Sequence, residues 1–216
     1  MSKGIFITIE GPDGAGKTTV LQAITPKLQF LSNKEILVTR EPGGVAIAEQ
    51  IREIILSKNN QNMDERTEAL LFAASRRQHL IEKVMPALNK GDIVIADRYV
   101  DSSLAYQGVG RKLGVEAIVQ LNDFAIEGFL PDLTLYFDVD TETGLERIRK
   151  NRSEEEVNRL DMDEFNFHQR VRHGYLKLAE QYPERIKKID AKKTISEVAD
   201  KAIETIIQQF PTEFNR

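Results

Sequence analysis

Short apolar runs alternate along this chain with longer stretches in which apolar side chains recur every three or four residues. The short runs are rich in Ile, Val and Leu, as β-strands are, and the longer stretches are typical of helices with one buried face. The predicted strands are residues 4–9, 35–39, 93–96, 133–138 and 185–189. The predicted helices are residues 19–31, 46–56, 67–89, 115–127, 141–150, 162–181 and 195–209.

Strands that alternate with helices predict βαβ units and an α/β fold with a largely parallel sheet. The 216 residues contain no evident internal repeat and no Pro- or Ser-rich linker, and this length suits one domain. We therefore predict a single domain over residues 1–216. Charged residues of both signs crowd between residues 147 and 159, so this segment is expected to be solvated and mobile.

The composition excludes several classes of protein. The chain has no cysteine, which excludes disulfide bonds and thiolate metal sites and fits a cytoplasmic protein. It has no run of about 18 apolar residues, so no membrane-spanning helix is expected. The formal net charge of −4 argues against general affinity for nucleic acid. The many arginines are therefore expected to have local roles, such as binding small phosphorylated ligands.

Residues 11–18 read Gly-Pro-Asp-Gly-Ala-Gly-Lys-Thr, which matches the whole phosphate-loop pattern G-x-x-x-x-G-K-[ST] between a predicted strand and a predicted helix. The glycines let successive backbone N–H groups turn toward a phosphate, and the helix N-terminus faces the same anion. Lys17 can reach the β- and γ-phosphates, and the Thr18 hydroxyl can hold Mg²⁺. An accidental Gly-rich turn is the alternative, which the complete pattern disfavours. The predicted nucleoside triphosphate site consists of Gly11, Pro12, Asp13, Gly14, Ala15, Gly16, Lys17 and Thr18.

Further candidate residues follow the next two predicted strands. Ligands bind beyond the carboxyl ends of the strands in sheets of this kind. Arg40 follows the second strand, and Asp97 and Arg98 follow the run 93–96, so the three side chains should converge on the phosphate loop. Asp97 would orient Mg²⁺ directly or through water, and Arg98 is a candidate clamp for the phosphate of a second substrate. The alternative is a structural ion pair between Asp97 and Arg98.

A candidate nucleobase site lies on the predicted helix 67–89. Phe72 and Arg76 are four residues apart, so both project from one face, where the ring can stack on a base and the guanidinium can bond its edge. The alternative is a core phenylalanine beside a surface arginine. Farther along the chain, Ser103 and Gln107 share a helical spacing, and Tyr106 adds a rigid wall.

Two other patterns are rejected. Residues 89–92 match the guanine-reading N-K-x-D motif, but they precede a predicted strand instead of following one, and Gly91 is better explained as a helix stop. The three histidines, His79, His168 and His173, have no mutual spacing that suits a metal site.

Taken together, residues 11–18, 39–44, 71–77, 97–99 and 102–108 closely resemble the bacterial thymidylate kinase family over nearly the whole chain. The resemblance implies the nucleoside monophosphate kinase variant of the P-loop fold, in which helices flank a five-stranded parallel sheet in three layers. It implies the reaction of ATP with dTMP, in the presence of Mg²⁺, to give ADP and dTDP, a step of dTTP biosynthesis. It also implies a homodimer.

The resemblance assigns roles to individual residues. It implies that Asp13 bonds the 3′-hydroxyl of the sugar and that Arg98 grips the dTMP phosphate. The remaining implied substrate contacts are Arg40 and Pro42 around the phosphate, Phe72 stacked on thymine, Arg76 as donor to O4, and Ser103, Tyr106 and Gln107 at the base and deoxyribose.

The resemblance also implies a mobile lid at about residues 147–160. One subgroup of the family carries a basic catalytic residue inside the phosphate loop, where this chain has Gly14 and Ala15. The chain therefore resembles the subgroup whose lid supplies the catalytic arginine, here Arg149 or Arg152, with Arg159 as a third candidate. Lys17 and Arg98 complete the predicted catalytic set. The rival interpretations are a kinase for another monophosphate or a deoxynucleoside, and a nucleotide-dependent switch.

Overall fold

The computed structural model describes residues 4–151 and 159–214. The described residues form a five-stranded parallel sheet of order β2-β3-β1-β4-β5. The predicted strands are all confirmed, with ends that differ by one residue at most. The strands are β1 (Ile5–Glu10), β2 (Ile36–Arg40), β3 (Ile93–Asp97), β4 (Leu133–Asp138) and β5 (Ile186–Asp190).

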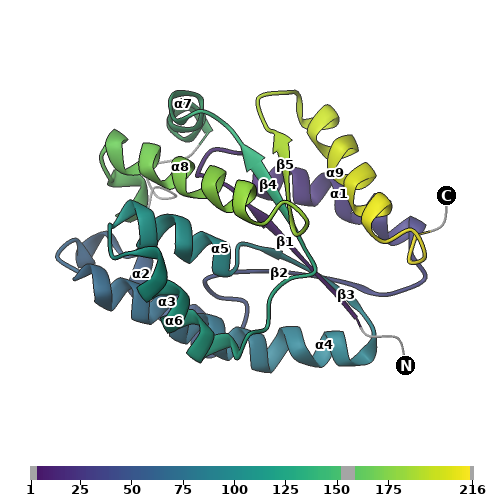
Figure 1. Ribbon diagram of the computed structural model, residues 1–216, viewed down its shortest axis with the longest axis horizontal. Helices are drawn as coiled ribbons and strands as arrows, with labels where there is room; N and C mark the ends of the chain where they lie inside the picture. Colours follow the sequence, from purple (N-terminus) through teal and green to yellow (C-terminus); the bar gives the residue numbers. More distant parts are fainter. Residues whose placement is uncertain (1–3, 152–158, 215–216) are drawn as a thin grey trace.

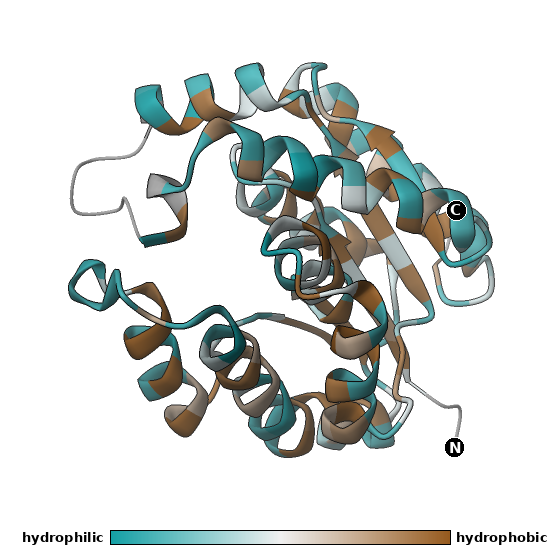
Figure 2. Cartoon of the chain, turned by 60° about the vertical axis from the view of Figure 1, so that its left-hand side comes forward, coloured by the Kyte–Doolittle hydropathy of each residue, from teal (hydrophilic) through white to brown (hydrophobic). Residues whose placement is uncertain are grey.

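Helices cover both faces of the sheet (Figure 1), which confirms the predicted three-layer fold. On one face, α1 (Lys17–Leu31) and α9 (Ile195–Gln209) pack their apolar side chains against β1, β3 and β4. On the other face, two apolar clusters join the sheet to helices that follow β2 and precede β5 in the sequence. These helices are α3 (Glu65–His79), α4 (Met85–Lys90), α6 (Val115–Ile126) and α8 (Phe165–Gln181). In Figure 2 the strands are mostly hydrophobic, while the helices carry hydrophobic and hydrophilic residues on different faces.

The predicted helix 67–89 is confirmed as helical but is not one uniform helix. A π-helical turn, η2 (Leu80–Val84), separates α3 from α4. Pro86 near the start of α4 has no N–H to donate, so the regular α-helical ladder cannot pass through it. The helix ends at Gly91, whose φ of 92° is left-handed. Gly91 is therefore a helix stop, as predicted.

The shorter helices include segments that periodicity did not reveal. Helices α2 (Ala46–Leu56) and α7 (Thr141–Asn151) agree with the prediction, and α8 begins three residues later than expected. Residues 100–110 form α5 (Val100–Ser103) and a second π-helical segment, η3 (Leu104–Gly110), both almost completely buried. Two 3-10 turns complete the description, η1 (Lys58–Asn60) and η4 (Arg159–Met162).

The strand register brings the predicted functional loops together. Asp97 at the end of β3 is paired with Ile9 of β1 on one side and with Arg40 of β2 on the other. The phosphate loop after β1, the loop after β2 and the residues after β3 therefore leave the sheet at one edge. Within the described residues, no helix combines the length and hydrophobicity needed to cross a bilayer.

Candidate active site

The phosphate loop joins β1 to α1 in a conformation that depends on glycine. Gly14 has a φ of 77°, and a Cβ atom there would lie 2.1 Å from the backbone oxygen of Gly144. Any other residue at this position would clash with the backbone of α7. Lys17 begins α1, and its Nζ donates to the backbone oxygens of Gly11 at 3.0 Å and Pro12 at 2.9 Å. The ammonium group is thus held at the mouth of the loop.

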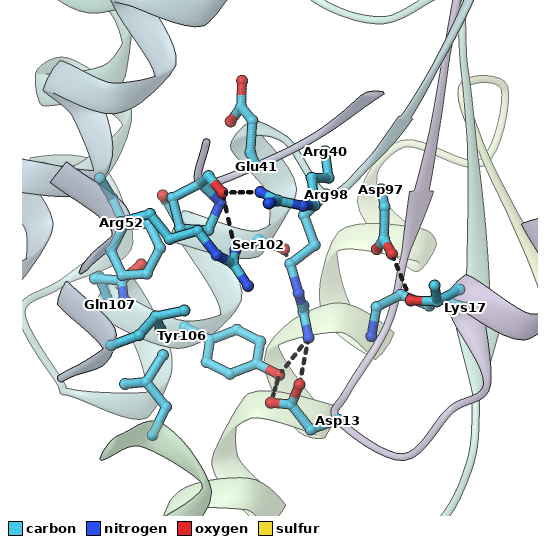
Figure 3. Close-up of a pocket in the computed structure, with 16 residues that line it drawn as sticks. Asp13, Lys17, Arg40, Glu41, Arg52, Asp97, Arg98, Ser102, Tyr106 and Gln107 are labelled. Carbon is cyan, nitrogen blue, oxygen red and sulfur yellow. Dashed lines mark hydrogen bonds and ion pairs between the residues drawn. The ribbon is translucent and has the colours of Figure 1, made fainter. Parts of the chain in front are cut away.

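One cavity opens beside this loop and collects most of the predicted site residues (Figure 3). It lies between the phosphate loop, the loop after β2, α3 and the segment from α5 to η3. The predicted residues that line it are Asp13, Lys17, Thr18, Arg40, Pro42, Phe72, Asp97, Arg98, Ser103, Tyr106 and Gln107. Of the predicted substrate-binding residues, the cavity lining lacks Arg76.

Arg98 points into this cavity from a strained backbone. Its φ of 74° lies in the left-handed region, which non-glycine residues rarely adopt. Arg98 Nη2 bonds Asp13 Oδ1 at 2.7 Å, and the Tyr106 hydroxyl donates to Asp13 Oδ2 at 2.6 Å (Figure 3). The proposed alternative, an ion pair between Asp97 and Arg98, is wrong, because Arg98 pairs with Asp13 across the cavity.

The buried carboxylate of Glu10 supports the side chain of Arg98 through shared partners. Glu10 was not among the predicted site residues. Glu10 Oε1 accepts from the Tyr99 backbone N–H at 2.7 Å, which holds the turn after Arg98. Glu10 Oε2 accepts from the hydroxyls of Ser102 at 2.6 Å and Tyr175 at 2.9 Å, and both of those oxygens also accept from Arg98 Nη1. An acidic residue at the end of an otherwise apolar strand was the available signal for Glu10.

Glu10 gives a prediction for the pH dependence of stability. Burial raises the pKa of Glu10 to about 7, and the charge of Asp101 adds to this, against the lowering effects of Ser102, Arg98 and the Tyr99 N–H. A carboxyl whose pKa is higher in the folded state binds more protons there, so its contribution to stability is lost as pH rises from about 4.5 to about 7. Denaturant unfolding at several pH values should therefore show that the free energy of unfolding of wild type falls by about 1–3 kcal/mol relative to that of Glu10→Gln over this interval. A difference between the two proteins that stays constant with pH would contradict the prediction.

Thr18 and Asp97 form a candidate metal site. The Thr18 hydroxyl donates to Asp97 Oδ2 at 2.9 Å. Asp97 Oδ1 is buried and has no hydrogen-bond partner among the described residues. A carboxylate oxygen without a partner beside a hydroxyl suits Mg²⁺, which prefers oxygen ligands and takes the remainder from water and phosphate. Within residues 4–151 and 159–214, no group of three or more acidic or histidine side chains is arranged to hold a metal ion.

Three arginines give one end of the cavity a positive charge. Arg40 and Arg98 were predicted there, and Arg52 of α2 joins them without having been predicted. Arg40 Nη1 and Arg52 Nη1 donate to the backbone oxygen of Pro42 at 3.2 and 2.9 Å, so this loop orients both side chains. Burial and the charge of Arg40 lower the pKa of Arg52. A phosphate group would relieve this repulsion.

Arg76 does not line the cavity. It is 1% exposed and lies behind the wall, where it donates to Glu41, Ser103, Asn122 and the backbone oxygen of Tyr99. Because Arg76 is buried, the alternative interpretation of it as a surface residue is also wrong. Phe72, one helical turn earlier, is half-buried and faces the cavity. The spacing placed the two residues on one helix, but it could not tell how deep the guanidinium would lie.

The candidate lid arginines have different surroundings. Arg149 is exposed on the last turn of α7, and Arg152 lies outside the described residues. Arg159 is buried, where its Nη2 pairs with Glu68 and its Nε donates to the Ile55 backbone oxygen at 2.9 Å. Arg159 is therefore occupied by structural contacts to α2 and α3.

A second cavity shares the phosphate loop with the first. Asp13, Lys17 and Thr18 line both cavities, and Gly14, Ala15 and Gly16 line only the second. Arg147 of α7 also lines it, held by the backbone oxygen of Ala191 at 2.9 Å. Lys193 and Thr194, before α9, complete its polar wall. None of these last three residues was predicted, because nothing in the local sequence links α7 and the loop after β5 to the phosphate loop.

The chain is similar to thymidylate kinases in sequence and in fold. A family model for thymidylate kinase matches residues 9–202. The chain is 56% identical to the thymidylate kinase of Enterococcus faecalis over 212 residues, which are 98% of this chain and 100% of that protein. It is 56% identical to the thymidylate kinase of a Geobacillus species over 209 residues, which are 96% of this chain and 98% of that protein. The solved thymidylate kinase from Ehrlichia chaffeensis is similar in fold, with a TM-score of 0.75 and 32% identity, covering 94% of this chain and 99% of that one. The chain belongs to the thymidylate kinase family.

Proposed function

We propose that the protein transfers the γ-phosphoryl group of ATP to dTMP, giving ADP and dTDP. The observation that carries the proposal is the meeting of two cavities at the phosphate loop, where Asp13, Lys17 and Thr18 line both. A donor in one cavity and an acceptor in the other would bring their phosphates together there. Membership of the thymidylate kinase family supports the identity of both substrates.

ATP is proposed to occupy the second cavity, with its phosphates on the N–H groups of the phosphate loop. The acceptor dTMP is proposed to occupy the first cavity, with its phosphate between Arg40, Arg52 and Arg98. Asp13 and Tyr106, which bond each other and line the same cavity, are proposed to position the deoxyribose. This arrangement supports direct transfer, because alignment of the reacting groups supplies much of the rate enhancement in such reactions.

Charge neutralisation is the main chemical contribution of the protein in this proposal. Phosphoryl transfer needs little covalent work, so cations beside the moving phosphoryl group dominate catalysis. Lys17 and Arg98 are proposed to supply this charge together with an arginine of the lid, residues 147–160. Arg149 and Arg152 are the candidates for that arginine. The dTMP phosphate is itself a nucleophile, so no general base is required.

Mg²⁺ is proposed to enter with ATP. Thr18 and the free oxygen of Asp97 would hold it, the latter directly or through water. When bound, the ion neutralises charge on the β- and γ-phosphates. Lys17 and Thr18 both line the two cavities, so both are proposed to act on the phosphates that meet there.

The base of dTMP is proposed to stack on Phe72 and to bond side chains of the α5–η3 segment. Gln107 donates from Nε2 to Glu68 at 2.8 Å, which leaves its amide oxygen to accept from N3–H of thymine. Ser103 accepts from Arg76 at 3.0 Å, so its own proton can be donated to the carbonyl oxygen at position 4. In this proposal Arg76 acts on the base through Ser103 and does not contact it directly.

Base recognition gives a prediction of substrate preference. We expect kcat/KM to be highest for dTMP, then dUMP, with dCMP far below. Uracil lacks only the 5-methyl group, a loss of about 1–3 kcal/mol. Cytosine has no proton on N3 and carries a donor at position 4, so buried polar groups lose their partners at a cost of several kcal/mol by order of magnitude. ADP production with each monophosphate in turn measures the order, and equal use of dCMP and dUMP would contradict the proposed pairing.

The same measurement separates the rival functions. A kinase for another monophosphate would prefer a different acceptor. A nucleotide-dependent switch would hydrolyse ATP slowly without any acceptor. The proposed function requires that ATP turnover depends on added dTMP, and turnover that is independent of monophosphate would overturn it.

A homodimer is proposed from the family resemblance, and exposed apolar side chains support it. Phe124 of α6 is 88% exposed and Leu70 of α3 is 57% exposed, on helices that lie side by side (Figure 1). Apolar residues on adjacent helices favour association with a second copy of the chain. The molar mass in solution tests this directly, and a mass of one chain would contradict it. The cytoplasmic location and the single domain over residues 1–216 stay predictions.

A further inference from the structure

Glu68 carries a buried carboxylate that lies outside the first cavity. Three segments of the chain converge on this carboxylate. It belongs to α3 and is 1% exposed. Its Oε1 accepts from Gln107 Nε2 at 2.8 Å and from Arg111 Nε at 3.2 Å. Its Oε2 accepts from Arg111 Nη2 at 3.1 Å and from Arg159 Nη2 at 2.5 Å. One carboxylate therefore contacts η3, the residue that follows it, and η4.

This carboxylate is held in place as well as paired. Arg111 also makes two hydrogen bonds to Asp163, at 2.6 and 2.7 Å, and Arg159 bonds the Ile55 backbone oxygen of α2. The two arginines and two carboxylates have opposite charges in equal number, so the group is neutral as a whole. Glu68 cannot rotate without breaking contacts to both arginines.

Glu68 stays ionised in this network. Burial alone would raise its pKa, but hydrogen bonds and charge from Arg111, with further hydrogen bonds from Gln107 and Arg159, outweigh burial and lower the pKa. An ionised carboxylate only accepts hydrogen bonds. The side chain of Gln107 must therefore turn its NH₂ group toward Glu68, whichever way the amide would otherwise lie.

The orientation of this amide decides which base edge can be read. Gln107 lines the first cavity, and with its NH₂ group directed to Glu68 the amide offers an acceptor to a ligand. Thymine and uracil present N3–H, a donor, whereas cytosine presents a lone pair at N3. If the amide were flipped, its NH₂ group would face the base and would favour the lone pair at N3 of cytosine.

We propose that Glu68 is a specificity-determining residue, which excludes cytosine nucleotides from the first cavity by fixing the amide of Gln107 with its oxygen toward the base. Glu68 itself does not touch the substrate and acts through Gln107. The inference rests on the proposed function, since it requires a pyrimidine monophosphate in this cavity. The inference adds that the selectivity of Gln107 depends on Glu68, a partner that can accept hydrogen bonds but cannot donate them.

Substitution of Glu68 by glutamine tests the inference, because glutamine has nearly the same shape but can also donate. In Glu68→Gln the amide of Gln107 can turn over and pair with N3 of cytosine. We expect the ratio of kcat/KM for dTMP to that for dCMP to fall at least about tenfold, through a lower KM for dCMP, as expected for one exchanged hydrogen bond. In Glu68→Asp, which keeps an acceptor-only group, the ratio should stay close to that of wild type even where total activity falls.

A charge control uses the same network at a distance from Gln107. Asp163→Asn also removes one negative charge that pairs with Arg111, but it leaves Glu68 and its bond to Gln107 intact. Its dTMP to dCMP ratio should equal that of wild type. A ratio in Glu68→Gln equal to that of wild type would overturn the inference, and so would an equal fall in Glu68→Asp or Asp163→Asn.

Two further measurements keep the test decisive. Should Glu68→Gln fail to fold, the charge-balanced double variant Glu68→Gln with Arg111→Gln is compared with Arg111→Gln alone, and the same fall in ratio is expected between them. An equal ratio in these two proteins would overturn the inference.

Wild type is measured first with dTMP and dCMP. If wild type shows no dTMP-dependent turnover, the proposed function fails, whereas a selective wild type with a selective Glu68→Gln variant refutes only the role of Glu68.

Discussion

Replacing Lys17 with alanine is expected to lower kcat about 100- to 1,000-fold, as the loss of one preorganised charge at a reacting oxygen typically does. Lys17 lines both cavities, and its ammonium is held by two backbone oxygens of the phosphate loop at the point where the two substrates would meet. Steady-state kinetics at saturating ATP and dTMP measure the effect. A thermal melt shows whether the variant is folded.

Lys27→Ala is the matched control for this experiment. Lys27 lies on the same helix, α1, but is exposed and pairs with Asp200 of α9 at 3.2 Å. An exposed pair of this kind contributes little to stability, so activity and melting temperature should stay close to wild type. A folded Lys17→Ala variant with near-normal turnover would show that the phosphate loop does not bind the transferred group.

Replacing Arg149 or Arg152 with alanine is expected to lower kcat far more than it weakens dTMP binding. The phosphate loop has Gly14 and Ala15 where a basic catalytic residue would otherwise stand. An arginine that contacts the phosphoryl group only in the transition state is worth about 10³–10⁵ in kcat. Arg159 is unsuited to this role because it is ion-paired with Glu68. We expect at least one of the two single variants to lose most of its kcat with little change in the KM for dTMP.

Lys150→Ala provides the comparison, since Lys150 stands between the two arginines in the sequence, is exposed and pairs with Glu146 at 2.6 Å. Its removal changes the charge of the same segment without removing a candidate catalytic group, so kcat should not change. The role of the lid would be refuted if both single variants and the double variant kept kcat while the KM for dTMP rose.

Local sequence was sufficient for the sheet and for the phosphate loop. Apolar runs and periodic stretches reproduced every strand of the described residues and most helices, because a short apolar run and an apolar residue every three or four positions are both local features of the sequence. It was insufficient for the whole segment from Val100 to Gly110, where only the spacing of Ser103 and Gln107 indicated a helix. Polar and apolar side chains are both buried in this segment, among them Asp101 and Gln107, so no exposed polar face marks its helical period.

The sequence by itself determined the parts of the site that depend on contiguous residues. The glycines and Lys17 of the phosphate loop act through backbone geometry over eight residues, and Asp97 and Arg98 follow directly from the end of a strand. The tertiary structure alone decided the destination of long polar side chains. Arg76 lies behind the cavity wall, and Glu68 lies where three segments meet. A charged group enters the interior only beside partners that offset its desolvation, and those partners lie far away in the sequence, so no local pattern could have located them.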